Sequence, residues 1–72
     1  MFSSKADIII VEEKAPPGKI RFICREKNTT WLIGDKESNL SHVDIEEIIG
    51  ANRGPGIDIS VYDEDGQTVG SA

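Results

Sequence analysis

The stretch KIRFICREKNTTWLIG, residues 19–34, decides the fold that we predict for this chain. Its first half alternates as a half-buried strand does, with one face carrying Ile20, Phe22 and Cys24 and the other carrying Arg21, Ile23 and Arg25. Its second half, residues 30–33, is β-branched and aromatic. Polar residues join the halves, and Asn28 is the one that best tolerates a left-handed turn conformation. The pattern predicts a β-hairpin with one buried face.

Further strands are predicted on both sides of this hairpin. Upstream, residues 7–14 contain the unbroken apolar run 8–11, which is typical of a strand covered on both faces. The prolines at 16 and 17 end that strand, because they remove backbone donors. Downstream, residues 57–62 alternate between apolar and polar side chains, and the acidic turn 63–66 leads into a short last strand at 67–69.

One short helix is predicted between the hairpin and the last two strands. Ser41 is a good N-cap residue, and Asp44 follows at the third helical position. Apolar residues at 45, 48 and 49 share one face, and Gly50 is a natural stop. A helix of about two turns is too short to be stable alone, so its role is to close a core.

These elements predict an α+β, mainly β, fold with the order β-β-β-α-β-β. Five strands would form a bent sheet or a small barrel plugged by the helix. This order resembles that of SH3-like small barrels, but no motif extends the resemblance to function. We expect a flexible N-terminus at 1–6, a single small β-rich domain at 7–70 and a C-terminal tail at 71–72. The predicted core contains Ile8, Ile10, Ile20, Phe22, Cys24, Leu40, Ile45, Ile48, Ile49, Ile57, Ile59 and Val61, with Trp31 and Ile33 at its margin.

Length and composition exclude several classes of protein. Seventy-two residues make one domain, and a single cysteine, Cys24, excludes an internal disulfide. The single histidine, His42, cannot build a zinc site with that cysteine alone. The longest apolar run is four residues, far short of the ~20 that a transmembrane helix needs. We therefore expect a soluble, cytoplasmic chain without metal or cofactor.

The charge is unevenly distributed along the chain. The net charge is −5, but residues 14–36 carry +4, residues 1–13 carry −2 and residues 37–72 carry −7. The basic hairpin and the acidic C-terminal half either lie side by side and offset each other or face different partners. The sequence leaves both arrangements open.

No pattern in the sequence predicts an enzyme. His42 is expected to be an exposed residue at the start of the helix, and Cys24 is in phase with the core. Acids 63–65 resemble the start of a calcium loop, but no acid follows them to complete the ligand set. The glycine-rich segment 53–56 follows a helix, whereas a phosphate loop precedes one. Clustered acid–base or nucleophilic groups are missing.

Two functions of different classes remain. The first is a small acidic intracellular protein-interaction module, a regulator or inhibitor of a larger assembly, that binds through a sheet edge or a charged surface; pairing with its own copy as a homodimer is a variant of this. The alternative is nucleic-acid binding through the basic hairpin 19–33, although a pI of about 4.6 weighs against it. The candidate binding residues are Lys19, Arg21, Arg25, Lys27 and Trp31.

Overall fold

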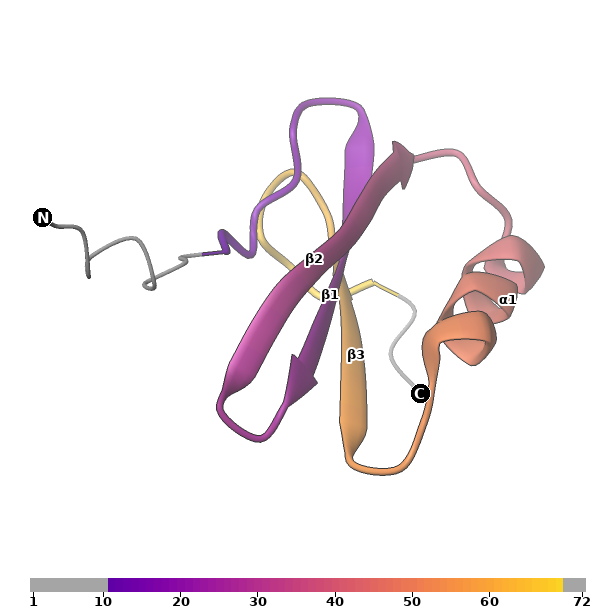
Figure 1. The fold of residues 1–72 in the computed structure, drawn as a ribbon. Helices are drawn as coiled ribbons and strands as arrows, with labels where there is room; N and C mark the ends of the chain where they lie inside the picture. Colours follow the sequence, from indigo (N-terminus) through magenta and orange to yellow (C-terminus); the bar gives the residue numbers. More distant parts are fainter. Residues whose placement is uncertain (1–10, 70–72) are drawn as a thin grey trace, which may run out of the picture.

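In the part of the chain that the structure describes, three strands form one open antiparallel sheet, and one helix packs against it (Figure 1). This computed structural model describes residues 11–69. Strand β1 (Lys19–Glu26) lies in the centre, with β2 (Thr29–Glu37) on one side and β3 (Ile57–Tyr62) on the other. Helix α1 (His42–Asn52) connects the two outer strands. The chain is thus a small β-rich α+β domain with the order β-β-α-β.

The prediction of five strands in a bent sheet or SH3-like barrel is wrong. Residues 7–10 of the first predicted strand lie outside the described residues, and residues 11–14 form no strand. The predicted strand 67–69 is reduced to one antiparallel bridge between Thr68 and Tyr62. Within residues 11–69 the sheet ends at β2 and β3 and does not close.

Side-chain interactions explain why residues 11–14 and 67–69 form no strand. Glu12 and Glu13 contact arginines on a face of the sheet, so their segment crosses that face instead of pairing at an edge. In the last turn, the Asp63 carboxylate accepts hydrogen bonds from the backbone N–H groups of Asp65 and Gln67, both at 2.9 Å. This closes the turn through a side chain, and only one bridging residue pair follows it.

A β-bulge interrupts the hairpin. Regular pairing runs from the turn to Ile23 opposite Leu32, but the next residue, Phe22, lies opposite Gly34. Ile33 is therefore the extra residue on β2, and it packs against the core. Such a bulge shifts all later pairs by one position.

The shift changes which charges face each other. Without the bulge, the pairing near the turn would continue and place Lys19 opposite Lys36. With it, Lys19 lies opposite Glu37 and Arg21 lies opposite Asp35. Opposite charges across an antiparallel pair stabilise it, whereas like charges destabilise it. The bulge therefore replaces a repulsive pair with an attractive one.

The hairpin turn holds a left-handed residue at Lys27, with φ 53°, where the sequence had favoured Asn28. Because a side chain in this conformation costs about 1–3 kcal/mol, we expect Lys27→Gly to raise the free energy of unfolding by about 1 kcal/mol. Asn28→Gly is the matched control; since Asn28 has a negative φ, glycine there should be neutral or destabilising. Urea unfolding of both variants checks this, and a Lys27→Gly variant less stable than the wild type would contradict it.

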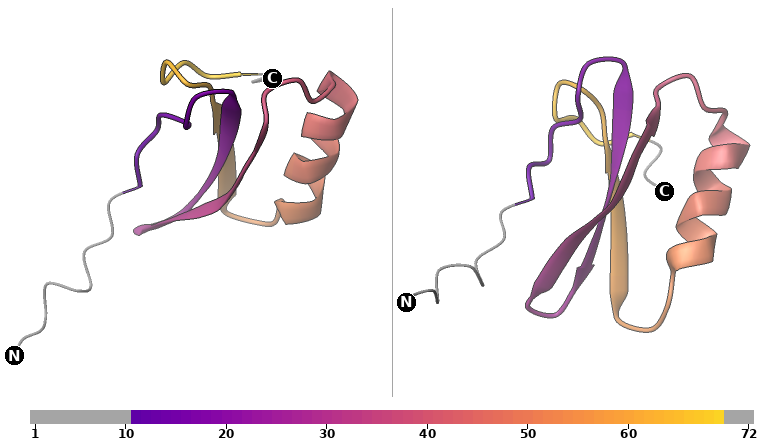
Figure 2. Two further views of the ribbon diagram at one scale, coloured as in Figure 1. Left: turned by 90° about the horizontal axis from the view of Figure 1, so that it is seen from above. Right: turned by 45° about the horizontal axis from the view of Figure 1, so that its top comes forward.

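The predicted helix is confirmed, and it covers one face of the sheet (Figure 2). The Ser41 side chain accepts a hydrogen bond from the backbone N–H of Asp44, and the helix continues two residues beyond Gly50. Together with the helix, β1 and β3 supply the buried residues of this core, which are Ile20, Phe22, Ile45, Ile49 and Val61. Partly buried residues surround it: Ile33, Leu40, Ile48, Ile59 and Val69.

The opposite face of the sheet is also partly buried, which the sequence did not predict. Segment 11–18 lies on this side, across the sheet from the helix (Figure 2). Ile23 was predicted to point outward with Arg21, yet its exposed fraction is 0%. Ala15 and Tyr62 are buried too, and the backbone N–H of Ala15 donates to the Asp63 carbonyl at 3.0 Å. We call this side of the sheet the second face.

Candidate functional site

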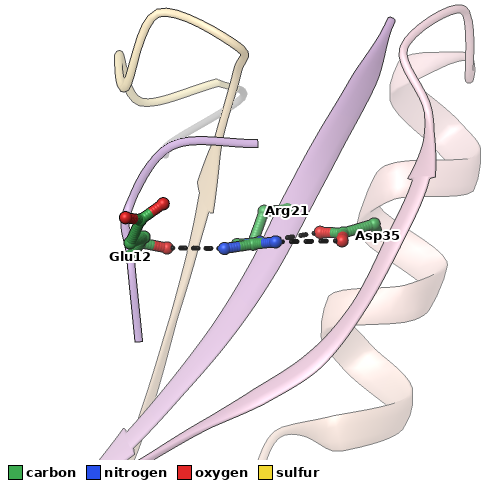
Figure 3. Close-up of polar contacts among 3 residues, drawn as sticks. All are labelled: Glu12, Arg21 and Asp35. Carbon is green, nitrogen blue, oxygen red and sulfur yellow. Dashed lines mark hydrogen bonds and ion pairs between the residues drawn. The ribbon is translucent and has the colours of Figure 1, made fainter. Parts of the chain in front are cut away.

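Arg21 is clamped between two segments of the chain (Figure 3). Its Nε and Nη2 atoms donate to the two carboxylate oxygens of Asp35 on β2, at 2.8 and 3.1 Å. Its Nη1 atom donates to the Glu12 carbonyl at 3.1 Å. The hydrogen bond to Asp35 raises the pKa of Arg21 above its ordinary value, as expected for a charge held by its partner. This guanidinium joins the central strand to both β2 and segment 11–15.

Arg25 is held in a similar way four residues further along β1. Its Nη2 atom donates to the Glu13 carboxylate, and its Nη1 atom donates to Ser60 Oγ at 3.2 Å. The guanidinium carbon also lies 5.7 Å from the centroid of the Tyr62 ring, within the range of a cation–π contact. Arg21 and Arg25 thus flank the buried Ile23 on the second face.

The other two predicted cations lie near the ends of β1. Lys19 forms an ion pair with Glu37 across the hairpin, and Lys27 is exposed in the turn. Three of the four predicted cations are therefore engaged by acids. Of those acids, Asp35 and Glu13 lie outside residues 37–72, the acidic C-terminal half in which the sequence hypothesis sought the partners, whereas Glu37 is the first residue of that half. In the structure, these three basic side chains hold neighbouring segments of the chain together. We call the contacts of Arg21 and Arg25 with their acidic partners the braces of the second face.

The remaining predicted residue, Trp31, lies on the edge strand β2. Its exposed fraction is 37%, and that of its neighbour Leu32 is 43%. Trp31 lies opposite Cys24 and Leu32 lies opposite Ile23, so the two side chains are on opposite faces of the sheet. Trp31, predicted at the margin of the core, is thus exposed. The sequence analysis did not include Leu32 among the candidate binding residues. Its position next to Trp31 on a strand of the hairpin was the signal that could have indicated it.

The two edges of the sheet differ in how they are covered. At β3, the backbone N–H of Val69 donates to the Val61 carbonyl at 2.7 Å, so the end of that strand is already paired. At β2, the part of the chain that the structure describes contributes no backbone partner to Thr29–Lys36 other than β1. The free edge of β2 is the longer one.

Groups suited to catalysis or metal binding do not converge in residues 11–69. Within that range no three His, Cys, Asp or Glu side chains form a metal-binding group, and no pocket is present. Cys24 is buried, and burial raises the pKa of its thiol, which disfavours the reactive thiolate. His42 Nε2 lies 3.8 Å from Glu46 on the exposed first turns of α1. The helix that these residues form, α1, is neither long nor apolar enough to cross a membrane.

Comparison with protein-family models, curated proteins and solved structures finds no match for this chain. What the structure itself gives is the fold of the described residues, a three-stranded antiparallel sheet with one helix on one face. Its function has to be argued from the surfaces that this topology leaves open.

Proposed function

We propose that this chain is a protein-interaction module that binds an extended polypeptide segment along the free edge of β2. The observation that carries the proposal is an edge strand of nine residues with Trp31 and Leu32 exposed in adjacent positions. An added strand pairs with the backbone of such an edge, and its alternate side chains cover both faces. Trp31 and Leu32 would each contact one of those faces.

The edge carries features that limit indiscriminate pairing. The bulge at Ile33 and the exposed charge of Lys36 both disfavour aggregation through a free edge. The exposed apolar residues lie on the turn side of the bulge, within Thr29–Leu32. A selective binding edge is expected to combine accessible backbone groups with local restrictions of this kind.

The nucleic-acid alternative has less support. Binding to phosphates requires cations that are free to exchange their counterions. Arg21 and Arg25 are each held by a carboxylate and by a further protein group, and Lys19 has Glu37 as its partner. Releasing these residues for a phosphate would remove the braces of the second face. We therefore favour the protein partner.

Selection of extended peptides from a displayed library tests the proposal. We expect the selected peptides to shift the amide resonances of β2 and to change the fluorescence of Trp31. Leu32→Lys should weaken their binding at least about tenfold, or about 1.4 kcal/mol, because it places a charge where an apolar contact is needed. Val43→Lys is the matched control, since Val43 is also an exposed apolar residue but lies on α1.

Two results would contradict the proposal. One is a set of peptides that binds Leu32→Lys as tightly as the wild type. The other is a set whose resonance shifts lie on α1 and leave β2 unchanged. A parallel titration with oligonucleotides at low salt examines the alternative, for which Trp31 quenching that weakens steeply with added salt would be required.

A further inference from the structure

We infer that a second copy of this chain can occupy the free edge of β2, in an antiparallel strand pair around a two-fold axis. This inference rests on the proposed function and names one partner for it. It starts from the bulge at Ile33, which divides β2 into two halves, Thr29–Leu32 and Gly34–Glu37. The first half contains the exposed apolar side chains and the second half contains the charges.

The bulge also changes which residues share a face of the sheet. In the first half, Trp31 lies on the face covered by α1, because it is opposite Cys24. In the second half, Lys36 lies on that same face, because it is opposite Ile20. Odd-numbered residues before the bulge therefore share a face with even-numbered residues after it. The remaining β2 residues lie on the second face: Thr30, Leu32, Asp35 and Glu37.

This alternation makes the strand self-complementary. Side chains directly opposite each other in an antiparallel pair lie on the same face, and a two-fold axis perpendicular to the sheet preserves the faces. Along the full length of β2, the faces match only in registers that place the first half of one copy opposite the second half of the other. The apolar half of each copy therefore meets the charged half of its partner.

Two registers satisfy this rule. In the first, Trp31 lies opposite the partner's Lys36 and Leu32 lies opposite the partner's Asp35. In the second, Trp31 lies opposite the partner's Gly34 and Thr29 lies opposite the partner's Lys36. Neither register places like charges opposite each other. The first allows a cation–π contact on Trp31, and the second allows the tryptophan ring to cover a glycine.

The same features predict a weak dimer. A single strand pair buries less than the ~1,000 Å² that a stable complex normally requires, so the dimer should dissociate on dilution. Each copy also carries a net charge of −5, and the two copies repel each other. Salt screens that repulsion. Association should therefore become stronger as salt is added, unlike association driven by opposite net charges.

Sedimentation across a concentration series, combined with engineered disulfides, tests the inference. The double variant Thr30→Cys/Glu37→Cys matches the first register, and Thr29→Cys/Lys36→Cys matches the second. Thr30→Cys/Lys36→Cys is the control, because its two positions lie on different faces. Along one strand these pairs are about 20–23 Å apart, far beyond the ~7 Å limit of a disulfide, so any bond that forms must link two copies. The native Cys24 is buried, so we do not expect it to take part in cross-linking.

The inference predicts a concentration-dependent dimer that Leu32→Glu abolishes, because the new carboxylate lies opposite the partner's Asp35 in the first register and against the partner's Ile33 in the second. It also predicts a covalent dimer from a face-matched variant but not from the control. A chain that stays monomeric at all concentrations while peptides still bind β2 would overturn the second copy and leave the proposed function intact. Equal cross-linking of the control, or a dimer that persists in Leu32→Glu, would overturn the edge pairing. A monomer to which no peptide binds would overturn both.

Discussion

Replacing Ile23 with alanine is expected to lower the free energy of unfolding by about 2–5 kcal/mol. Ile23 has an exposed fraction of 0% and lies between the two braced arginines on the second face. Alanine would leave a cavity there, because the paired strands on both sides cannot move in to fill it. A single core in a domain of this size rarely supplies more than about 3–5 kcal/mol, so most of the variant chain should be unfolded.

Two further variants make this prediction measurable. Ile23→Val removes one methylene group and should cost about 0.5–1.5 kcal/mol, which urea unfolding can resolve even if the alanine variant does not fold. Leu32→Ala is the matched control, because Leu32 lies opposite Ile23 on the same face but is 43% exposed. Its cost should be clearly smaller. If Ile23→Ala is no more destabilising than Leu32→Ala, the second face is not a core.

Replacing Asp35 with alanine is expected to cost about 2 kcal/mol, within the ~1.5–3 kcal/mol typical of hydrogen bonds to charged groups. The side chains of Arg21 and Asp35 are only 16% and 25% exposed, so the arginine left behind would be partly buried without its carboxylate. The Glu12 carbonyl would remain as its partner. Loss of this brace should loosen β2 and segment 11–15 together.

Glu37→Ala provides the control for this prediction. Glu37 forms the neighbouring ion pair with Lys19, but this pair is far more exposed to solvent, and exposed pairs contribute about 0–1 kcal/mol. Urea unfolding of the two variants, with a double-mutant cycle of Arg21 and Asp35, separates the pair from its surroundings. Equal costs for Asp35→Ala and Glu37→Ala would show that the Arg21 clamp has no special role.

The strongest local signals in the sequence predicted the structure correctly. The alternation around Phe22 produced β1, the residues after the turn produced β2, and the cap at Ser41 marks the start of α1. Each of these depends on a period or a cap within a few neighbouring residues. The alternation at 57–62 likewise predicted β3 with the bounds that the structure shows.

The errors arose where distant residues decide the outcome. Residues 11–14 cross a face of the sheet because Glu12 and Glu13 meet arginines that come later in the chain. Ile23 is buried because that segment covers the second face, although strand alternation alone places it with the arginines. The bulge at Ile33 could have been suspected from charge, since regular pairing would oppose Lys19 and Lys36. Hydropathy alone contains no such information.

For the candidate binding residues, too, local features were predictable and distant contacts were not. Lys19, Arg21, Arg25, Lys27 and Trp31 were chosen because they share a hairpin, and the structure does place them there. Their partners were not predictable from local pattern, because Asp35 faces Arg21 only after the register shift. The exposed pair Trp31 and Leu32 follows from the position of β2 at the edge, which is a property of the topology.

Amide hydrogen exchange along β2 tests most directly the central claim that its free edge accepts an added strand. The exchange rates of Thr29–Glu37 would be compared in dilute protein, in concentrated protein and in dilute protein saturated with a selected peptide. We expect the amides of β2 that point away from β1 to exchange rapidly in dilute protein and to become protected in both other samples, while exchange in α1 is unchanged. Exchange of those amides at the same rate in all three samples would contradict the claim.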